Sequence, residues 1–104
     1  MEEFTCEVLI VGTGPAGLSA GIYCARSNRD VIILDGKAIS ALARTKEIQN
    51  WPGEIEITGE KLLEKFRAHA ESYSENIRIM QGDVISLMLG MGVNMISTRT
   101  SNIT

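Results

Sequence analysis

The sequence predicts an α/β fold built on a parallel sheet, and three observations support this prediction. An apolar strand, Val8 to Val11, leads directly into a Gly-x-Gly-x-x-Gly turn that spans Gly12 to Gly17. A helix-compatible segment follows at once. A second apolar strand, Asp30 to Asp35, comes next and ends in a carboxylate. A glycine turn between a strand and a helix is typical of dinucleotide-binding βα units, so the chain begins as one.

The three glycines of the turn have separate mechanical roles. Gly12 permits the tight turn at the end of the strand, and Gly14 leaves room for a pyrophosphate to approach the backbone. Gly17 lets the helix pack closely on the sheet. Pro15 suits the first helical turn, where the N–H it lacks would have no intrahelical partner. Phosphates would therefore lie over free N–H groups at the positive end of the helix.

Asp35 stands where such a site needs an acceptor for ribose hydroxyls. It lies 18 residues beyond Gly17, close to the spacing of roughly 20 residues in the dinucleotide-binding fingerprint. An aspartate at a strand end can also simply start a loop or cap a helix. The upstream glycine motif favours the ribose role.

The next elements follow from periodicity and turn chemistry. The first helix is expected from Pro15 to Arg26, and Ser27 to Arg29 turns the chain into the second strand. From Gly36 to Asn50 the periodicity is poor, which predicts a surface excursion with a short helical turn around Ile39 to Ala43. Trp51-Pro52-Gly53 predicts a firm turn, because proline fixes one backbone angle and glycine frees the next.

A second helix is the clearest amphipathic segment of the chain. Thr58 is expected to cap it, and Glu60 favours its positive end. Ile77 to Met80 predicts a third strand, parallel to the second. The apolar stripe of this helix comprises Leu62, Phe66, Ala70 and Tyr73.

The last part of the sequence predicts a small antiparallel hairpin. Asp83 to Leu89 is the fourth expected strand, and Gly90-Met91-Gly92 turns the chain into a last strand from about Val93 to Thr98. The polar tail, Arg99 to Thr104, is expected to fray, so that residues 93–104 form a weakly ordered end. Three methionines, Met88, Met91 and Met95, are expected to pack this hairpin rather than to bind a ligand.

Composition excludes several classes of function. At 104 residues the chain holds one domain at most, and its net charge of −3 gives no electrostatic reason to bind nucleic acid or an anionic membrane. No segment approaches 18 apolar residues, and the start, Met1-Glu2-Glu3, lacks the basic residues of a signal peptide. A cytoplasmic location without membrane partners is therefore the expectation.

The few reactive side chains do not form a catalytic or metal-binding pattern. Cys6 and Cys24 make no C-x-x-C pair, so they predict no thiol redox function. His69 is the only histidine and is interpreted as a solvated or boundary residue of the second helix. No metal-ligand spacing and no nucleophile–base arrangement is present, so no catalytic residue is predicted.

Taken in order, these segments resemble the amino-terminal part of the low-molecular-weight thioredoxin reductase family of FAD flavoproteins. The matching residues are Val8 to Leu18, Ala20 to Arg26, Asp35, Glu47-Ile48-Gln49-Asn50-Trp51-Pro52-Gly53, Thr58 to Leu63 and Gly82-Asp83-Val84. The glycine motif alone is shared by many flavoproteins, but its combination with Asn-Trp-Pro-Gly and the following helix start is much more specific. The resemblance extends from Glu7 to about Val93 and implies a Rossmann-like, FAD-binding, three-layer fold. That fold combines a parallel sheet and helices with a small β-meander.

The resemblance also implies a set of cofactor contacts. FAD pyrophosphate would lie at Gly12, Gly14 and Ala16, and Asp35 would hold the adenosine ribose. Asn50 would reach the flavin side, and the backbone of Val84 would pair with adenine. The full set of candidate FAD-binding residues is Gly12, Thr13, Gly14, Pro15, Ala16, Gly17, Asp35, Gly36, Lys37, Leu42, Asn50, Asp83 and Val84.

Two positions depart from the family pattern. Glutamate is common where this chain has Asp35, and the shorter carboxylate can still accept both ribose hydroxyls. Family members have a Gly-Gly-Gln-Leu segment that covers the flavin end of the cofactor. This chain offers Ser40-Ala41-Leu42 instead, which leaves contacts to the ribityl chain and the flavin ring open.

Several parts of the family pattern have no counterpart in these 104 residues. Family members continue into a strand that ends in Ala-Thr-Gly and into an NADPH domain that carries a redox-active C-x-x-C. Residues 1–104 are therefore expected to form an incomplete FAD-binding domain without an NADPH domain, and NADPH would be used only if a further domain supplied its site. The family reduces disulfides with NAD(P)H, but these residues are not expected to be catalytic alone, which leaves enzymatic activity open.

Three interpretations of function remain from the sequence. The first is the FAD-binding part of a thioredoxin-reductase-like enzyme, completed by a complementing chain or a longer parent. The second is a non-catalytic interaction protein, a homo-oligomer that self-associates through Val8 to Val11, which becomes an exposed edge without the Ala-Thr-Gly strand. The third is NAD(H) binding, because an acidic residue at Asp35 suits any unphosphorylated ribose. The Asn-Trp-Pro-Gly segment favours FAD.

Overall fold

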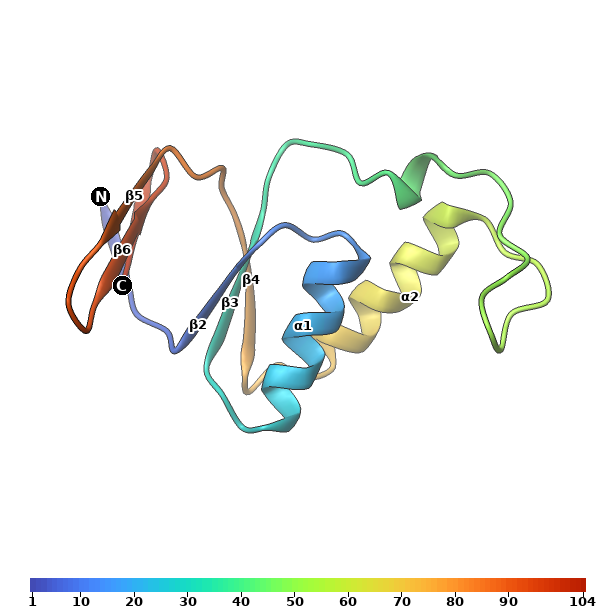
Figure 1. Cartoon of the computed structure of the whole chain (residues 1–104), viewed down its shortest axis with the longest axis horizontal. Helices are drawn as coiled ribbons and strands as arrows, with labels where there is room; N and C mark the ends of the chain where they lie inside the picture. The colour runs from blue at the N-terminus through green and yellow to red at the C-terminus, as the bar shows by residue number, and fades with distance from the viewer.

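The computed structural model describes residues 1–104 and shows three layers (Figure 1). The middle layer is a parallel sheet of β2 (Val8–Val11), β3 (Val31–Asp35) and β4 (Ile77–Gln81), in the order β2-β3-β4. Two helices, α1 (Pro15–Arg26) and α2 (Gly59–Glu71), cover one face of it. The predicted Rossmann-like α/β fold and its parallel pairing of the second and third predicted strands are confirmed.

The third layer is a small sheet on the opposite face of β2-β3-β4 (Figure 1). Three of its strands form an antiparallel meander: β5 (Ser86–Leu89), β6 (Asn94–Ser97) and β7 (Ser101–Ile103). The amino-terminal strand β1 (Glu2–Phe4) completes it by parallel pairing with β7. The sheet therefore joins the two ends of the chain.

Strand β3 explains why the molecule has a core on each side of the parallel sheet. All four of its apolar residues are at most 1% exposed, and successive side chains of a strand point to opposite faces. Val31 and Ile33 pack with Leu18 and Ala25 of α1 and with Ala70 of α2. The intervening side chains, Ile32 and Leu34, pack on the other side with Ile103 of β7, Phe4 and Leu9. A near-continuous apolar run is what a central parallel strand requires.

Helix boundaries follow the sequence signals closely. Helix α1 begins at Pro15 and ends at Arg26, as predicted, and Asn28 in the following turn takes a φ of 58°. The Thr58 side chain accepts a hydrogen bond from the Lys61 N–H at 3.2 Å, so the predicted cap of α2 is confirmed. The Trp51-Pro52-Gly53 turn is closed by a hydrogen bond from the Glu54 N–H to the Trp51 carbonyl, with Gly53 at a φ of 96°.

Three predictions about local structure need correction. The short helical turn lies at Leu42–Arg44 (η1), slightly beyond its predicted place. Strand β5 begins at Ser86 rather than Asp83, and residues 82–85 form irregular backbone. Strand β1 has no counterpart in the prediction.

The prediction of a frayed carboxyl-terminal tail is wrong. Residues 101–103 form β7, which pairs on both sides, with β1 and with β6. Ile103 is 1% exposed, because its side chain fills the core between the two sheets. The polarity of Ser101 and Asn102 hid this role, which the pairing of β7 with β1 and β6 and the burial of Ile103 reveal.

The prediction that the methionines pack the hairpin is also wrong. Met88 and Met95 face each other across β5 and β6, yet both are exposed, and Met91 at the turn is fully exposed. Strands β5 and β6 lie at one edge of the small sheet, and no other element of residues 1–104 covers these methionines, so their side chains remain exposed.

Candidate functional site

The candidate site lies at the carboxyl ends of the three parallel strands, where open α/β sheets bind ligands. Three small cavities of about 290, 260 and 520 Å³ meet there. Thr13 borders the first two, Asp35 borders the second and third, and Asp83 borders the first and third. Eight of the thirteen predicted residues line these cavities: Gly12, Thr13, Gly14, Asp35, Gly36, Lys37, Asp83 and Val84.

The glycine turn after β2 has the geometry of an anion cradle. Gly12 has a φ of 115°, a conformation that favours glycine, and α1 starts three residues later. The N–H groups of Thr13, Gly14, Ala16 and Gly17 donate to no acceptor within the chain. These are the unsatisfied donors of a helix N-terminus and the turn before it, and they suit a phosphate.

Gly14 and Gly17 face different surroundings within this turn. A Cβ on Gly17 would overlap the carbonyl of Gly12, so a side chain there would push α1 away from the turn. A Cβ on Gly14 would meet only the side chain of Ser40, whose Oγ would lie 3.4 Å away. Gly17 is therefore needed for packing, while Gly14 keeps the approach to the backbone open.

Asp35 is held by three side chains at the end of β3. Its Oδ1 accepts a hydrogen bond from the Thr13 hydroxyl at 2.7 Å. Its Oδ2 accepts from Arg67 Nη1 and from Gln81 Nε2, each at 3.0 Å. Thr13 comes from the glycine turn, Arg67 from α2 and Gln81 from the end of β4. This network fixes the carboxylate beside the cavities.

The same contacts set the protonation state of Asp35. Burial of this carboxyl raises its pKa, but hydrogen bonds from Thr13, Arg67 and Gln81 together outweigh burial and hold the pKa below its usual value. Asp35 is therefore an anionic acceptor at neutral pH, the state in which both of its oxygens can accept hydrogen bonds from ribose hydroxyls.

The adenine side of the predicted site lies between β3 and residues 82–84. The Lys37 N–H donates to Asp83 Oδ1 at 3.1 Å, and a Cβ on Gly36 would overlap the same carboxylate. Through these two contacts Asp83 connects the loop after β3 to the loop after β4. The half-buried Val84 has a backbone N–H and carbonyl with no partner in the chain, so both remain available to a ligand.

The other predicted residues lie apart from the three cavities. Pro15, Ala16 and Gly17 form the first turn of α1. Leu42 lies in η1, where its carbonyl packs against Gly59. Asn50 is exposed in the loop before the Trp51 turn. The structure therefore brings together most of the residues that the sequence predicted for the ADP half of FAD and leaves Leu42 and Asn50 outside that group.

Sequence reasoning missed Ser40, Arg67 and Gln81. Ser40 borders two of the cavities, and its Oγ faces Gly14. Gln81 could have been found, because β3 and β4 were predicted to be parallel and Asp35 is its direct register partner. Arg67 carries no such signal, since its position depends on how α2 is rotated against the sheet.

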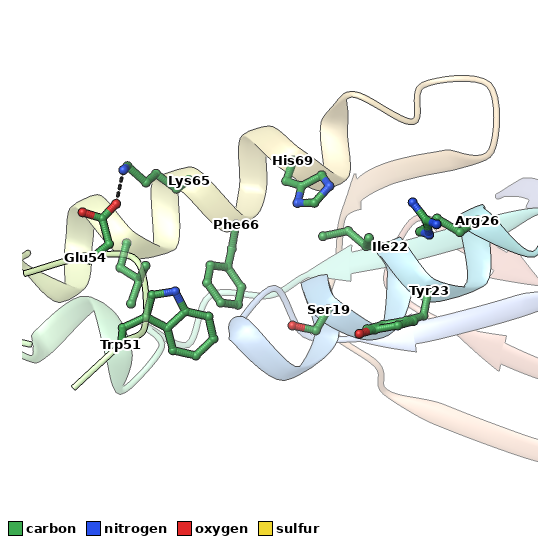
Figure 2. Close-up of a pocket in the computed structure, with 10 residues that line it drawn as sticks. Ser19, Ile22, Tyr23, Arg26, Trp51, Glu54, Lys65, Phe66 and His69 are labelled. Atoms are coloured by element: carbon green, nitrogen blue, oxygen red, sulfur yellow. Dashed lines mark hydrogen bonds and ion pairs between the residues drawn. The ribbon is translucent and has the colours of Figure 1, made fainter.

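A separate groove of about 670 Å³ lies between α1, α2 and the Trp51 turn (Figure 2). Trp51 and Phe66 contact each other in it, with ring centroids 5.3 Å apart. Lys65 forms an ion pair with Glu54 at its edge. His69 is exposed and stacks on Tyr73 at a centroid distance of 6.0 Å, which agrees with its interpretation as a surface residue.

The remaining reactive groups form no second site. Cys6 and Cys24 are both free thiols, and burial raises the pKa of Cys6. No group of three or more His, Cys, Asp and Glu side chains could hold a metal ion. Neither helix is long and apolar enough to cross a membrane.

Fold and site together define a Rossmann-like α/β domain with a glycine turn after its first parallel strand and an acidic residue at the end of the next. The sequence profile of the family "Pyridine nucleotide-disulphide oxidoreductase" matches residues 6–101, and the chain belongs to this family. The prediction from the sequence, the amino-terminal part of a thioredoxin-reductase-like flavoprotein, is confirmed.

The chain is similar to proteins that carry two different names, an ammonia-lyase and thioredoxin reductases. The chain is 43% identical over 72 residues to a glucosaminate ammonia-lyase of Pseudomonas fluorescens, a match that covers 67% of this chain and 22% of that protein. It is 40% identical over 73 residues to thioredoxin reductase of Vibrio cholerae, covering 68% and 23% of the two chains. The solved thioredoxin reductase of Gloeobacter violaceus superposes with a TM-score of 0.88 at 36% identity, covering 96% and 32%. The chain thus spans less than a third of these proteins.

Proposed function

We propose that residues 1–104 bind FAD through its ADP half, as the FAD-binding part of a thioredoxin-reductase-like oxidoreductase. The free N–H groups of the glycine turn carry this proposal, because they have no partner in the chain and suit a pyrophosphate. Asp35 accepts the ribose hydroxyls, and the unpaired backbone of Val84 pairs with adenine. Bound FAD would supply the redox chemistry of the site, because its flavin ring can accept and return electrons.

The residues of this chain fit the ADP half of the cofactor better than the flavin half. The cradle, the carboxylate and Val84 surround adjoining cavities, whereas Leu42 and Asn50 lie apart from them. Weak binding with an exposed flavin ring is the consequence. The NAD(H) alternative uses the same ADP half, and the presence of Asn50-Trp51-Pro52-Gly53 supports FAD over it.

The first experiment is the visible absorbance of the purified protein, before and after FAD is added and the sample is desalted. We expect the wild type to retain only part of the added flavin absorbance after desalting, in keeping with weak binding. Asp35→Ala is expected to weaken FAD affinity about ten- to hundredfold, the cost of hydrogen bonds to a charged acceptor. Asp30→Ala is the matched control, because Asp30 precedes the amino end of β3, where it pairs with Arg78, and should leave the affinity unchanged. Equal affinities of the Asp35→Ala protein and the wild type would contradict the proposal.

Residues 1–104 alone are not expected to catalyse the reduction of a disulfide. Cys6 and Cys24 are separate thiols without C-x-x-C spacing, so the chain holds no dithiol to pass electrons to a partner. Purified protein loaded with FAD is expected to show no NADPH-dependent reduction of a disulfide. If NADPH-dependent disulfide reduction persists after further purification, residues 1–104 have a catalytic role in addition to FAD binding.

A second candidate, self-association, is favoured by the position of β2. Within residues 1–104 this strand borders only β3, and Val11 is 64% exposed. The N–H groups of Val8 and Gly12 point toward β3 and form hydrogen bonds there. Because the backbone N–H groups of successive residues in a strand point to opposite sides, those of Leu9 and Val11 point to the open edge. An apolar edge without charge or proline can pair with another chain.

Light scattering after size exclusion tests this candidate. We expect a dimer in the wild type, and we expect Val11→Lys to shift it toward monomer at least about tenfold in dissociation constant, because a lysine on the edge discourages strand pairing. Leu89→Lys is the control, since Leu89 is also exposed but belongs to the other sheet. A clean monomer at high concentration would remove this candidate and leave FAD binding unaffected.

A further inference from the structure

The ion pair between Asp35 and Arg67 has a consequence for the choice of ligand. Arg67 Nη1 lies 3.0 Å from Asp35 Oδ2, and Arg67 Nε lies 3.7 Å from Glu71 Oε2. The Arg67 side chain is about one-third exposed and that of Asp35 about one-fifth. The guanidinium therefore lies at the ribose position of the proposed site, with its charge balanced by two carboxylates.

Arginine is the residue that accepts a ribose 2′-phosphate in sites that bind NADP, and a carboxylate in the same place selects an unphosphorylated ribose. This chain has both groups in direct contact. The cavity of about 260 Å³ beside them is also lined by the hydroxyl residues Thr13 and Ser40 and by the carboxylates of Glu60 and Glu64. With Asp35 in place, this surrounding is acidic and repels a dianionic phosphate.

We infer that Asp35 and Arg67 act as a pair that restricts the site to adenosine nucleotides with a free 2′-hydroxyl, and that Asp35 masks Arg67 as a latent phosphate ligand. The inference rests on the proposed binding of an ADP-containing cofactor and narrows it. FAD and NAD(H) are accepted, and 2′-phosphorylated nucleotides are excluded. In the wild type Arg67 is a positioning residue, because it orients the Asp35 carboxylate and favours its ionised form. Once that carboxylate is removed, Arg67 becomes a specificity residue that can bind a 2′-phosphate.

The test compares two probes that differ only in the 2′-phosphate, ADP-ribose and 2′-phospho-ADP-ribose, by calorimetric titration. The wild type is expected to prefer ADP-ribose by at least about tenfold. Asp35→Ser removes the carboxylate and leaves Arg67 free to bind phosphate. We expect the preference to move toward 2′-phospho-ADP-ribose by at least about tenfold, as one charge-assisted contact replaces a repulsion.

Two further variants assign this change to Arg67. The double variant Asp35→Ser with Arg67→Gln should no longer show the shift in preference toward 2′-phospho-ADP-ribose, because it lacks the guanidinium as well as the carboxylate. Asp35→Asn removes the negative charge but keeps the shape of the side chain, so it tests the inference even if Asp35→Ser loosens the fold. We expect it to move the preference toward 2′-phospho-ADP-ribose by a smaller factor than Asp35→Ser does. An unchanged preference in Asp35→Ser and Asp35→Asn, or a shift that survives Arg67→Gln, would overturn the inference.

Failure of the proposed function has a different result. The wild type would then bind neither FAD nor ADP-ribose. In that case Asp35→Ser must still bind 2′-phospho-ADP-ribose in an Arg67-dependent way for the inference to stand, and absence of that binding would overturn it.

Discussion

Gly17→Ala is expected to lower the free energy of unfolding by about 2–4 kcal/mol, measured by urea denaturation. Alanine gains about 1 kcal/mol over glycine in helix propensity, so the substitution would stabilise a helix with free space around it. Here the added Cβ would overlap the Gly12 carbonyl and lie 3.3 Å from Ile10 Cγ2. A backbone carbonyl cannot move aside as a flexible side chain can, and α1 must shift off the sheet. The steric cost therefore exceeds the gain in propensity.

Gly14→Ala is the matched control, since it makes the same change three residues earlier in the same turn. Its Cβ meets only Ser40 at ordinary contact distance, and Gly14 has a φ of −74° that any residue can adopt. We expect Gly14→Ala to cost at most about 1 kcal/mol of stability, the usual preference against alanine at a helix N-cap. FAD affinity should nevertheless fall, because the methyl group narrows the approach to the free N–H groups. Equal stability of the two variants would refute the separate roles of these glycines.

The sequence predicted those parts of the fold whose signals are local. Pro15 at the start of α1, the apolar run of β3 and the Thr58 cap of α2 each act within a few residues of themselves. Strands β1 and β7 were missed or misjudged, because they are short, partly polar and paired across almost the whole length of the chain. Strand β1 has its only partner at the other end of the chain, and the local pairing of β7 with β6 was hidden by the polarity of Ser101 and Asn102.

The candidate site shows the same division. The glycine turn and Asp35 have fixed spacings along one βα unit, so sequence could place them at one edge of the sheet. The hydrogen bond from Thr13 to Asp35 and the ion pair with Arg67 depend on how two loops and a helix pack. The aspartate that sequence reasoning assigned to ribose therefore turned out to belong to a network whose other members come from α2 and β4.

Ile103→Ala is expected to destabilise the protein by about 2–4 kcal/mol, although Ile103 is the penultimate residue of the sequence. Its side chain is 1% exposed and packs with Ile32 and Leu34 of β3, so the substitution leaves a cavity between the two sheets. In a domain with a total stability of about 5–15 kcal/mol, such a loss is large. Ile55→Ala is the matched control, because Ile55 is 94% exposed and should cost no more than about 0.5 kcal/mol.

The same substitution also connects the end of the chain to the site. Val84, whose backbone faces the proposed adenine, packs against the cluster that contains Ile103 and Leu34. A cavity there loosens Val84 as well as β7, so FAD affinity should fall together with stability. Ile77→Ala provides the contrast, since Ile77 is also buried but belongs to the core on the helix side of the sheet, at the amino end of β4 and away from the site. If Ile103→Ala and Ile77→Ala lower stability by similar amounts at 10 °C, where both variants remain folded, only Ile103→Ala should weaken binding of adenosine nucleotides through Val84. Equal losses of affinity in the two variants would show that Val84 responds to general destabilisation rather than to the packing of β7 beneath it.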